Sequence, residues 1–218
     1  MEQSDLPELF KRLREAAQTW TTPIVSDMAR HGAAPFEILI ASLLSARTLD
    51  TVTAVVAPRL FALARTPEQM IRLHTTEIEK AIHGVAFSET KSKQILRIAH
   101  ILLDEYNGQV PDDLERLDAL PGVGRKIANL VITDAFNKPG ICVDTHVHRI
   151  TNRWGYMHTK TPDETELALR EKLPPRYWLE INALLVALGQ NICRPTTPNC
   201  SHCPVYEFCE RVGVSKQR

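Results

Sequence analysis

The chain has 218 residues, of which 44% are hydrophobic and 24% are charged, enough for one large folded domain or two smaller ones. Its formal net charge is +0 at pH 7, so overall charge does not indicate a nucleic-acid partner, and any basic surface must come from local clustering. No apolar run approaches the ~20 residues needed to cross a bilayer, and the N-terminus lacks the apolar segment of a secretory signal. These features exclude a membrane partner and predict an intracellular protein.

Helix signals follow one another along the chain, and alternating strand patterns are scarce. The segments TPEQMIRL and TPDETELALREKLP each begin with an N-cap threonine, Thr66 and Thr161, followed by proline and, three residues after the threonine, glutamine or glutamate. A longer helix is predicted from Ser88 to Gly108, where four apolar residues share one face: Ile95, Ile98, Ile101 and Leu102. A short helix is expected at 111–119, with acidic residues in its first turn. We predict an all-α protein of about ten helices.

The segment LPGVGRKIANLV (120–131) places two glycines between a helix ending near Ala119 and one beginning near Gly124. Gly122 and Gly124 can adopt positive φ and put no side chain over the turn. Backbone N–H groups beside the start of a helix are then open to an anion such as phosphate. An ordinary connection between two helices, in which glycine only ends the first, explains this pattern equally well.

Lys126 falls in the first turn of the second helix, where a cation opposes the helix dipole. That is an unusual place for an ordinary surface lysine. Asp144 follows eighteen residues later, in VDTHVHRITNRW, and is expected to cap the helix that it precedes. A helix of about 12 residues and a short return would bring Asp144 back near Lys126. An amine nucleophile beside a carboxylate is suited to attack at the C1′ carbon of a sugar.

Four of the five cysteines crowd into the last 26 residues as C-x6-C-x2-C-x5-C, formed by Cys193, Cys200, Cys203 and Cys209. In an intracellular chain this clustering favours a metal site over disulfide bonds. The spacing does not decide between a zinc ion and an iron–sulfur cluster. Cys142 stands apart in an apolar stretch and is interpreted as a buried core residue.

Three features together, LPGVGRK with its lysine, VDTH and the cysteine pattern, resemble the endonuclease III family of helix-hairpin-helix DNA glycosylases. The likeness runs from ILIASLLSARTLD to Cys209. It implies an all-α fold with two lobes: a six-helix lobe at 25–138 that contains the hairpin, and a lobe of 1–24 plus 139–218 with a C-terminal iron–sulfur cluster loop. It also implies a bifunctional enzyme of base excision repair, which excises oxidised pyrimidines and nicks the strand at abasic sites by β-elimination.

The resemblance also implies roles for individual residues. Lys126 corresponds to the nucleophile that attacks C1′ of a nucleotide rotated out of the duplex, and Asp144 to the carboxylate that supports departure of the base. The four cysteines correspond to ligands of a 4Fe-4S cluster, which positions a DNA-contacting loop and does no hydrolysis. The residues expected to bind DNA, in the hairpin and elsewhere, are Leu120, Gly122, Val123, Gly124, Arg47, Val85 and Lys91.

Two segments depart from the family pattern. The family often has glutamine at the position of Arg47, which is associated with filling the space left by the flipped base. The segment GVAFSETKSKQI is slightly longer than the pattern, so either Val85 or Phe87 is the side chain that wedges into the duplex. For Lys91, phosphate contact is the functional interpretation and a solvated helix face is the structural one.

Two other functions fit the same motifs. A monofunctional adenine or mismatch glycosylase would hydrolyse without a lysine, and such relatives usually lack lysine at this position. A non-catalytic DNA-binding module that keeps the cluster and the hairpin is the alternative from another class. The expected partner is double-stranded DNA with damaged bases or abasic sites. We expect a monomer in the bacterial cytoplasm, associated with the nucleoid.

Overall fold

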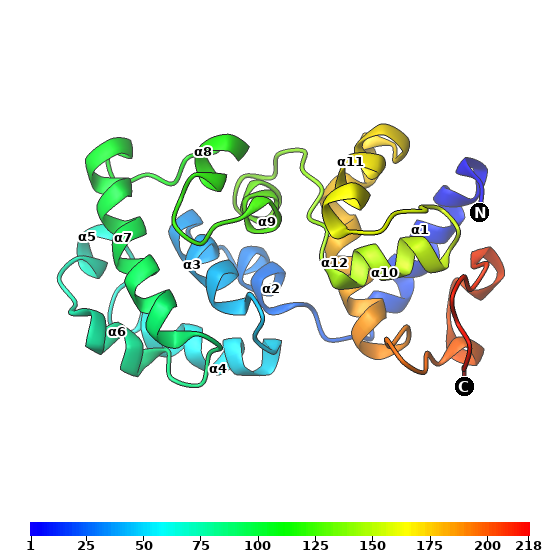
Figure 1. The fold of residues 1–218 in the computed structure, drawn as a ribbon, viewed down its shortest axis with the longest axis horizontal. Helices are drawn as coiled ribbons and strands as arrows, with labels where there is room; N and C mark the ends of the chain where they lie inside the picture. Colours follow the sequence, from blue (N-terminus) through cyan, green and yellow to red (C-terminus); the bar gives the residue numbers. More distant parts are fainter. The chain divides into compact units, whose positions relative to one another are not determined.

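The computed structural model describes residues 1–218, and all of its regular structure is helical, which confirms the predicted class. The chain forms two compact units. Unit 1 combines Met1–Pro23 with Pro139–Arg218, and unit 2 is the continuous segment Ile24–Lys138 (Figure 1). No helix combines the length and apolar character that crossing a membrane requires.

Unit 2 is built around an apolar helix that is buried on nearly all sides, α3, which lies against α9. Six of its helices have seven residues or more, and two are shorter. The helices of unit 2 are α2 (Ile24–Arg30), α3 (Pro35–Ser45), α4 (Asp50–Phe61), α5 (Pro67–Met70), α6 (Thr75–Ala81), α7 (Ser88–Tyr106), α8 (Leu114–Asp118) and α9 (Arg125–Phe136). The predicted N-cap Thr66 is confirmed, because its Oγ1 accepts the N–H of Gln69 at 3.3 Å.

The longest helix, α7, lies alongside α5 and α6 (Figure 1). Its predicted apolar face is confirmed at Ile95, Ile98 and Leu102, which are fully buried. The prediction is wrong for Ile101, which is only partly buried, because its position on the helix lies to one side of the buried apolar face. The helix ends at Tyr106, and Asn107, with φ of 52°, begins the turn.

Unit 1 packs its N-terminal helix against helices from the other end of the chain. Its elements are η1 (Gln3–Asp5), α1 (Leu6–Ala17), α10 (Thr145–Arg153), α11 (Pro162–Lys172), η2 (Pro175–Tyr177), α12 (Trp178–Asn191), η3 (Cys200–His202) and η4 (Tyr206–Phe208). Phe10 of α1 stacks on Tyr177 with ring centroids 4.1 Å apart. Thr161 caps α11 as predicted, and Cys142 is buried as predicted.

Candidate functional site

The hairpin between α8 and α9 has one glycine in the left-handed region, not two. Gly122 has φ of +77°, whereas Gly124 is extended, with φ of −95° and ψ of 174°, and is the N-cap of α9. Since glycine has no side chain, Gly124 itself makes no side-chain cap bond to the first-turn amides of α9. The start of α9 therefore presents N–H groups that a phosphate can accept from.

Leu120 and Val123 shape this turn from inside. Both side chains are buried. Their amides are also used within the protein, because the N–H of Leu120 donates to the carbonyl of Leu117 and the N–H of Val123 donates to the carbonyl of Leu120, each at 3.0 Å. These two residues therefore anchor the hairpin from inside, and their predicted contact with DNA stays a prediction.

Lys126 is the second residue of α9, and it is exposed, while Ile127 beside it faces the core. The amphipathic pattern of α9 thus fixes the direction of the lysine: the apolar face is turned to α3 and the lysine to solvent. The amine stands one residue after Arg125 at the positive end of the helix.

Asp144 is the N-cap of α10 and is half-buried. Its Oδ1 accepts the N–H of His146 at 2.8 Å and that of Val147 at 2.9 Å, so the capping role predicted from the sequence is confirmed. Both capping bonds use Oδ1. Lys126 belongs to unit 2 and Asp144 to unit 1, and their pairing stays a prediction.

The four C-terminal cysteines all line one small, enclosed and largely apolar cavity in unit 1, together with Trp154, Leu188 and Ile192. None of the cysteines is in a disulfide. Burial raises the pKa of the Cys203 and Cys209 thiols. No three metal-ligating side chains are close enough together in this structure to hold a single metal ion. Four thiols around one apolar cavity nevertheless fit the sulfur donor set of an iron–sulfur cluster or of a zinc tetrathiolate.

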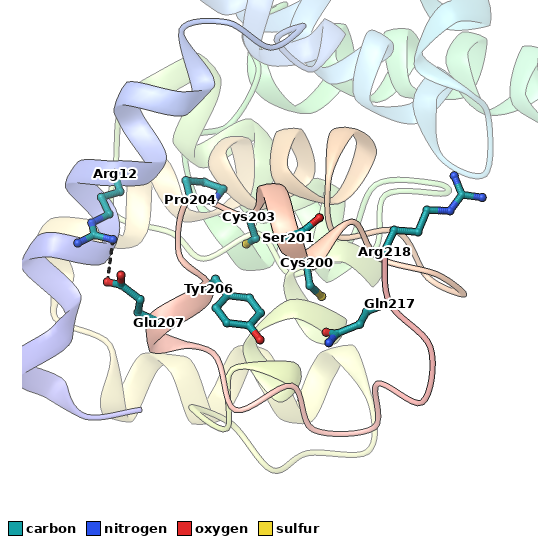
Figure 2. A pocket seen from close by; sticks show the side chains of 9 residues that line it. All are labelled: Arg12, Cys200, Ser201, Cys203, Pro204, Tyr206, Glu207, Gln217 and Arg218. Carbon is teal, nitrogen blue, oxygen red and sulfur yellow. Dashed lines mark hydrogen bonds and ion pairs between the residues drawn. The ribbon is translucent and has the colours of Figure 1, made fainter.

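Two of these cysteines, Cys200 and Cys203, also border an open pocket of about 460 Å³ (Figure 2). Arg12 of α1 lies at its edge, where its Nη1 donates to Glu207 Oε2 at 3.0 Å and its guanidinium lies 5.2 Å from the ring centroid of Phe208. These contacts hold the cysteine-bearing segment to the N-terminal helix.

Two arginines of α10 hold the first cysteine in place. Arg153 is buried; its Nη1 donates to Cys193 Sγ at 3.3 Å and to the carbonyl of Arg194 at 2.8 Å. Arg149 Nη2 donates to the carbonyl of Cys193 at 2.8 Å. The helix that Asp144 caps is therefore also the helix that positions Cys193. Neither arginine was predicted as a site residue from the sequence, although their spacing of four places them on one face of α10.

The structure corrects two DNA-binding predictions. Val85 is 5% exposed, so it is a core residue and does not wedge into DNA, whereas Phe87 is 60% exposed. Lys91 is also 5% exposed, and its Nζ donates to the carbonyls of Leu44 and Ala46, so it does not contact phosphate. The predicted residue Arg47 is exposed, and its guanidinium lies 5.7 Å from the ring centroid of Phe87.

Comparison with known proteins gives a consistent family assignment. The family described as HhH-GPD superfamily base excision DNA repair protein matches residues 40–175. Endonuclease III of Thermotoga maritima is 43% identical over 176 residues, covering 81% of this chain and 83% of that protein. Endonuclease III of Escherichia coli strain K12 is 34% identical over 203 residues, covering 93% of each. A solved structure of a non-covalent endonuclease III–DNA complex matches with a TM-score of 0.85 and 32% identity, over 97% of this chain and 96% of that one.

Proposed function

The chain belongs to the HhH-GPD superfamily of base excision DNA repair proteins, in its endonuclease III family, and we propose that it excises oxidised pyrimidines with Lys126 as the nucleophile and Asp144 as the supporting carboxylate. Membership makes the enzyme a DNA glycosylase with abasic-site lyase activity. The proposal adds the substrate class and the residues that perform each step. The observation that carries it is an exposed lysine in the first turn of α9, at a helix start whose N-cap is a glycine.

In this mechanism Lys126 Nζ attacks C1′ of the damaged nucleotide, and the C1′–N bond to the base breaks. The carboxylate of Asp144 stabilises the positive charge that develops on the sugar. The sugar ring then opens, and the amine and C1′ form a Schiff base. Loss of a proton from C2′ expels the 3′ phosphate oxygen, which nicks the strand. Because the cap of α10 uses Oδ1, Asp144 can hold its helix and still offer Oδ2 to the sugar.

DNA contact is assigned to three features of unit 2. Gly122 and Gly124 let the backbone approach a phosphate at the start of α9. Phe87 is the exposed aromatic side chain that wedges between bases once the nucleotide has left the stack. Arg47, beside it, binds the base left without a partner, or a phosphate. The substrate is double-stranded DNA that carries a damaged base or an abasic site.

Cys193, Cys200, Cys203 and Cys209 are the residues that would hold a 4Fe-4S cluster. Their sulfur-only set around an apolar cavity supports this assignment. When bound, the cluster supplies a fixed core for the surrounding loop, and it takes no part in base removal. Purified protein should be brown and contain iron and sulfide. A colourless protein that contains one zinc ion would overturn the assignment.

The central test is borohydride trapping on duplex DNA that contains an abasic site. Wild-type protein should form a covalent adduct, because reduction fixes the Schiff base, and Lys126→Ala should form none. Arg125→Ala is the matched control, since it removes the neighbouring positive charge but keeps the amine, and it should still be trapped. An adduct that survives Lys126→Ala contradicts the assignment of the nucleophile. Base release by the wild type without any adduct would indicate a monofunctional glycosylase instead.

A monomer in the bacterial cytoplasm, working on nucleoid DNA, is the setting that we assign to this activity. The similarity to bacterial endonuclease III proteins over more than four-fifths of their length supports it.

A further inference from the structure

Lys91 is a buried lysine that the mechanism above does not use. It lies on the inner side of α7, 5% exposed, and its ammonium group reaches the end of α3. Its Nζ donates to the carbonyl of Leu44 at 2.9 Å, to that of Ala46 at 2.7 Å and to Thr48 Oγ1 at 3.5 Å. An ammonium group has three hydrogens to donate, so all three are used.

Thr48 continues this connection to a second turn. Its Oγ1 accepts the N–H of Ala86 at 3.2 Å as well as the ammonium of Lys91. The loop after α3 and the loop before α7 are thus joined through one hydroxyl oxygen. Lys91 and its three acceptors form a strut, the Lys91 strut, that includes Thr48.

Each of the two loops contains a residue in an unfavourable backbone conformation. Arg47 has φ of 58° and Phe87 has φ of 60°, in the left-handed region that side-chain-bearing residues rarely adopt. Such conformations persist only where the surroundings hold them in place. Arg47 lies between two acceptors of the strut, and Phe87 directly follows Ala86, whose amide the strut binds.

The side of α7 that bears Lys91 also reaches the hairpin. Lys91 and Gln94 are three residues apart within α7, which places them on the same side of the helix. The amide group of Gln94 lies so close to Gly122 that a Cβ there would be 2.5 Å from it. One helix therefore supports the Arg47 loop, the Phe87 loop and the phosphate-binding turn.

We propose that Lys91 is a positioning residue that holds Arg47 and Phe87 in the arrangement needed to open a paired duplex, although it touches no DNA itself. This inference rests on the proposed function, in which Phe87 wedges between bases and Arg47 binds the base left without a partner or a phosphate. It predicts that losing Lys91 impairs extrusion of the nucleotide and leaves the chemistry of Lys126 intact.

The test compares two abasic substrates in single-turnover lyase assays. One has the abasic site in a fully paired duplex, and the other has it in a single-nucleotide bulge that is already out of the stack. For Lys91→Met, which keeps an unbranched side chain one atom shorter and removes the donors, the rate on the paired duplex should fall at least about tenfold. The rate on the bulge should stay within about threefold of wild type. Lys93→Met is the matched control, because Lys93 is an exposed lysine on the same helix and should leave both rates unchanged.

A merely structural role would lower both rates equally, and that result would overturn the proposal, as would a wild-type rate on the paired duplex. If Lys91→Met does not fold, Thr48→Val removes the link to Ala86 alone and should show the same substrate dependence, more weakly. Absence of strand cleavage by wild type on both substrates would instead contradict the proposed function. The two failures are therefore distinguishable.

Discussion

Asp144 combines a structural role with a proposed chemical one, and two substitutions separate them. Its Oδ1 accepts two backbone N–H groups at 2.8 and 2.9 Å. Asparagine retains Oδ1, so Asp144→Asn should change the free energy of unfolding by no more than about 0.5 kcal/mol. Asp144→Ala removes both capping bonds and should lower it by about 1 kcal/mol. Urea denaturation followed by circular dichroism measures both changes.

Single-turnover base excision then measures the chemical role. Both variants lack the carboxylate, so both should excise at least about 100-fold more slowly than wild type, whatever their stability. Thr161→Ala is the control for stability, because Thr161 Oγ1 caps α11 by accepting the N–H of Glu164 at 3.2 Å. Thr161→Ala should lower the free energy of unfolding by about 1 kcal/mol and leave the rate of base excision unchanged. Excision by Asp144→Asn at the wild-type rate would refute the reasoning, since it would reduce Asp144 to a helix cap.

Two more predictions use other parts of unit 2. Gly124 is extended, and a Cβ there meets nothing within 4 Å, so Gly124→Ser should cap α9 and raise stability by about 0.3 kcal/mol. The serine hydroxyl would accept a backbone N–H that is proposed to donate to a DNA phosphate, so DNA affinity, measured by fluorescence anisotropy, should fall. An unchanged affinity would contradict the proposed phosphate site. Burial lowers the pKa of Lys91 to about 8, so the unfolded state holds this proton to higher pH and stability rises with pH. The free energy of unfolding of wild type minus that of Lys91→Met should rise by about 2 kcal/mol between about pH 7.5 and about pH 9.5. If this difference does not change with pH, the lowered pKa of Lys91 is contradicted.

Features that depend on local spacing were predictable from the sequence. The caps at Thr66, Thr161 and Asp144 follow from short motifs, and the structure contains each of them. The lysine at the start of α9 was predictable for the same reason, because a glycine-rich turn and a change to helical periodicity fix its position to within one residue.

Features that depend on backbone acceptors were not predictable in the same way. Lys91 is four residues before Ile95 and therefore on the apolar face, yet an ionisable side chain there is read as solvated unless its partners are known. Those partners are mainly carbonyl oxygens, which every residue possesses, so no residue type marks them. Which of Val85 and Phe87 is exposed likewise depends on the left-handed backbone conformation of Phe87, which no local sequence motif predicts.

The assembly of unit 1 from both ends of the chain has a consequence for biosynthesis. The apolar side of α1 packs with residues of η2 and α12, and Arg14 pairs with Glu180 across 166 residues of sequence. At about 5–20 residues per second, the ribosome delivers that partner on the order of 10 s after α1 has emerged. Unit 2 is contiguous and complete within this interval. It can therefore fold on the nascent chain before the partners of α1 are made. A stall in translation after unit 2 has emerged but before residue 177 leaves unit 2 folded and the apolar side of α1 without the helices that cover it.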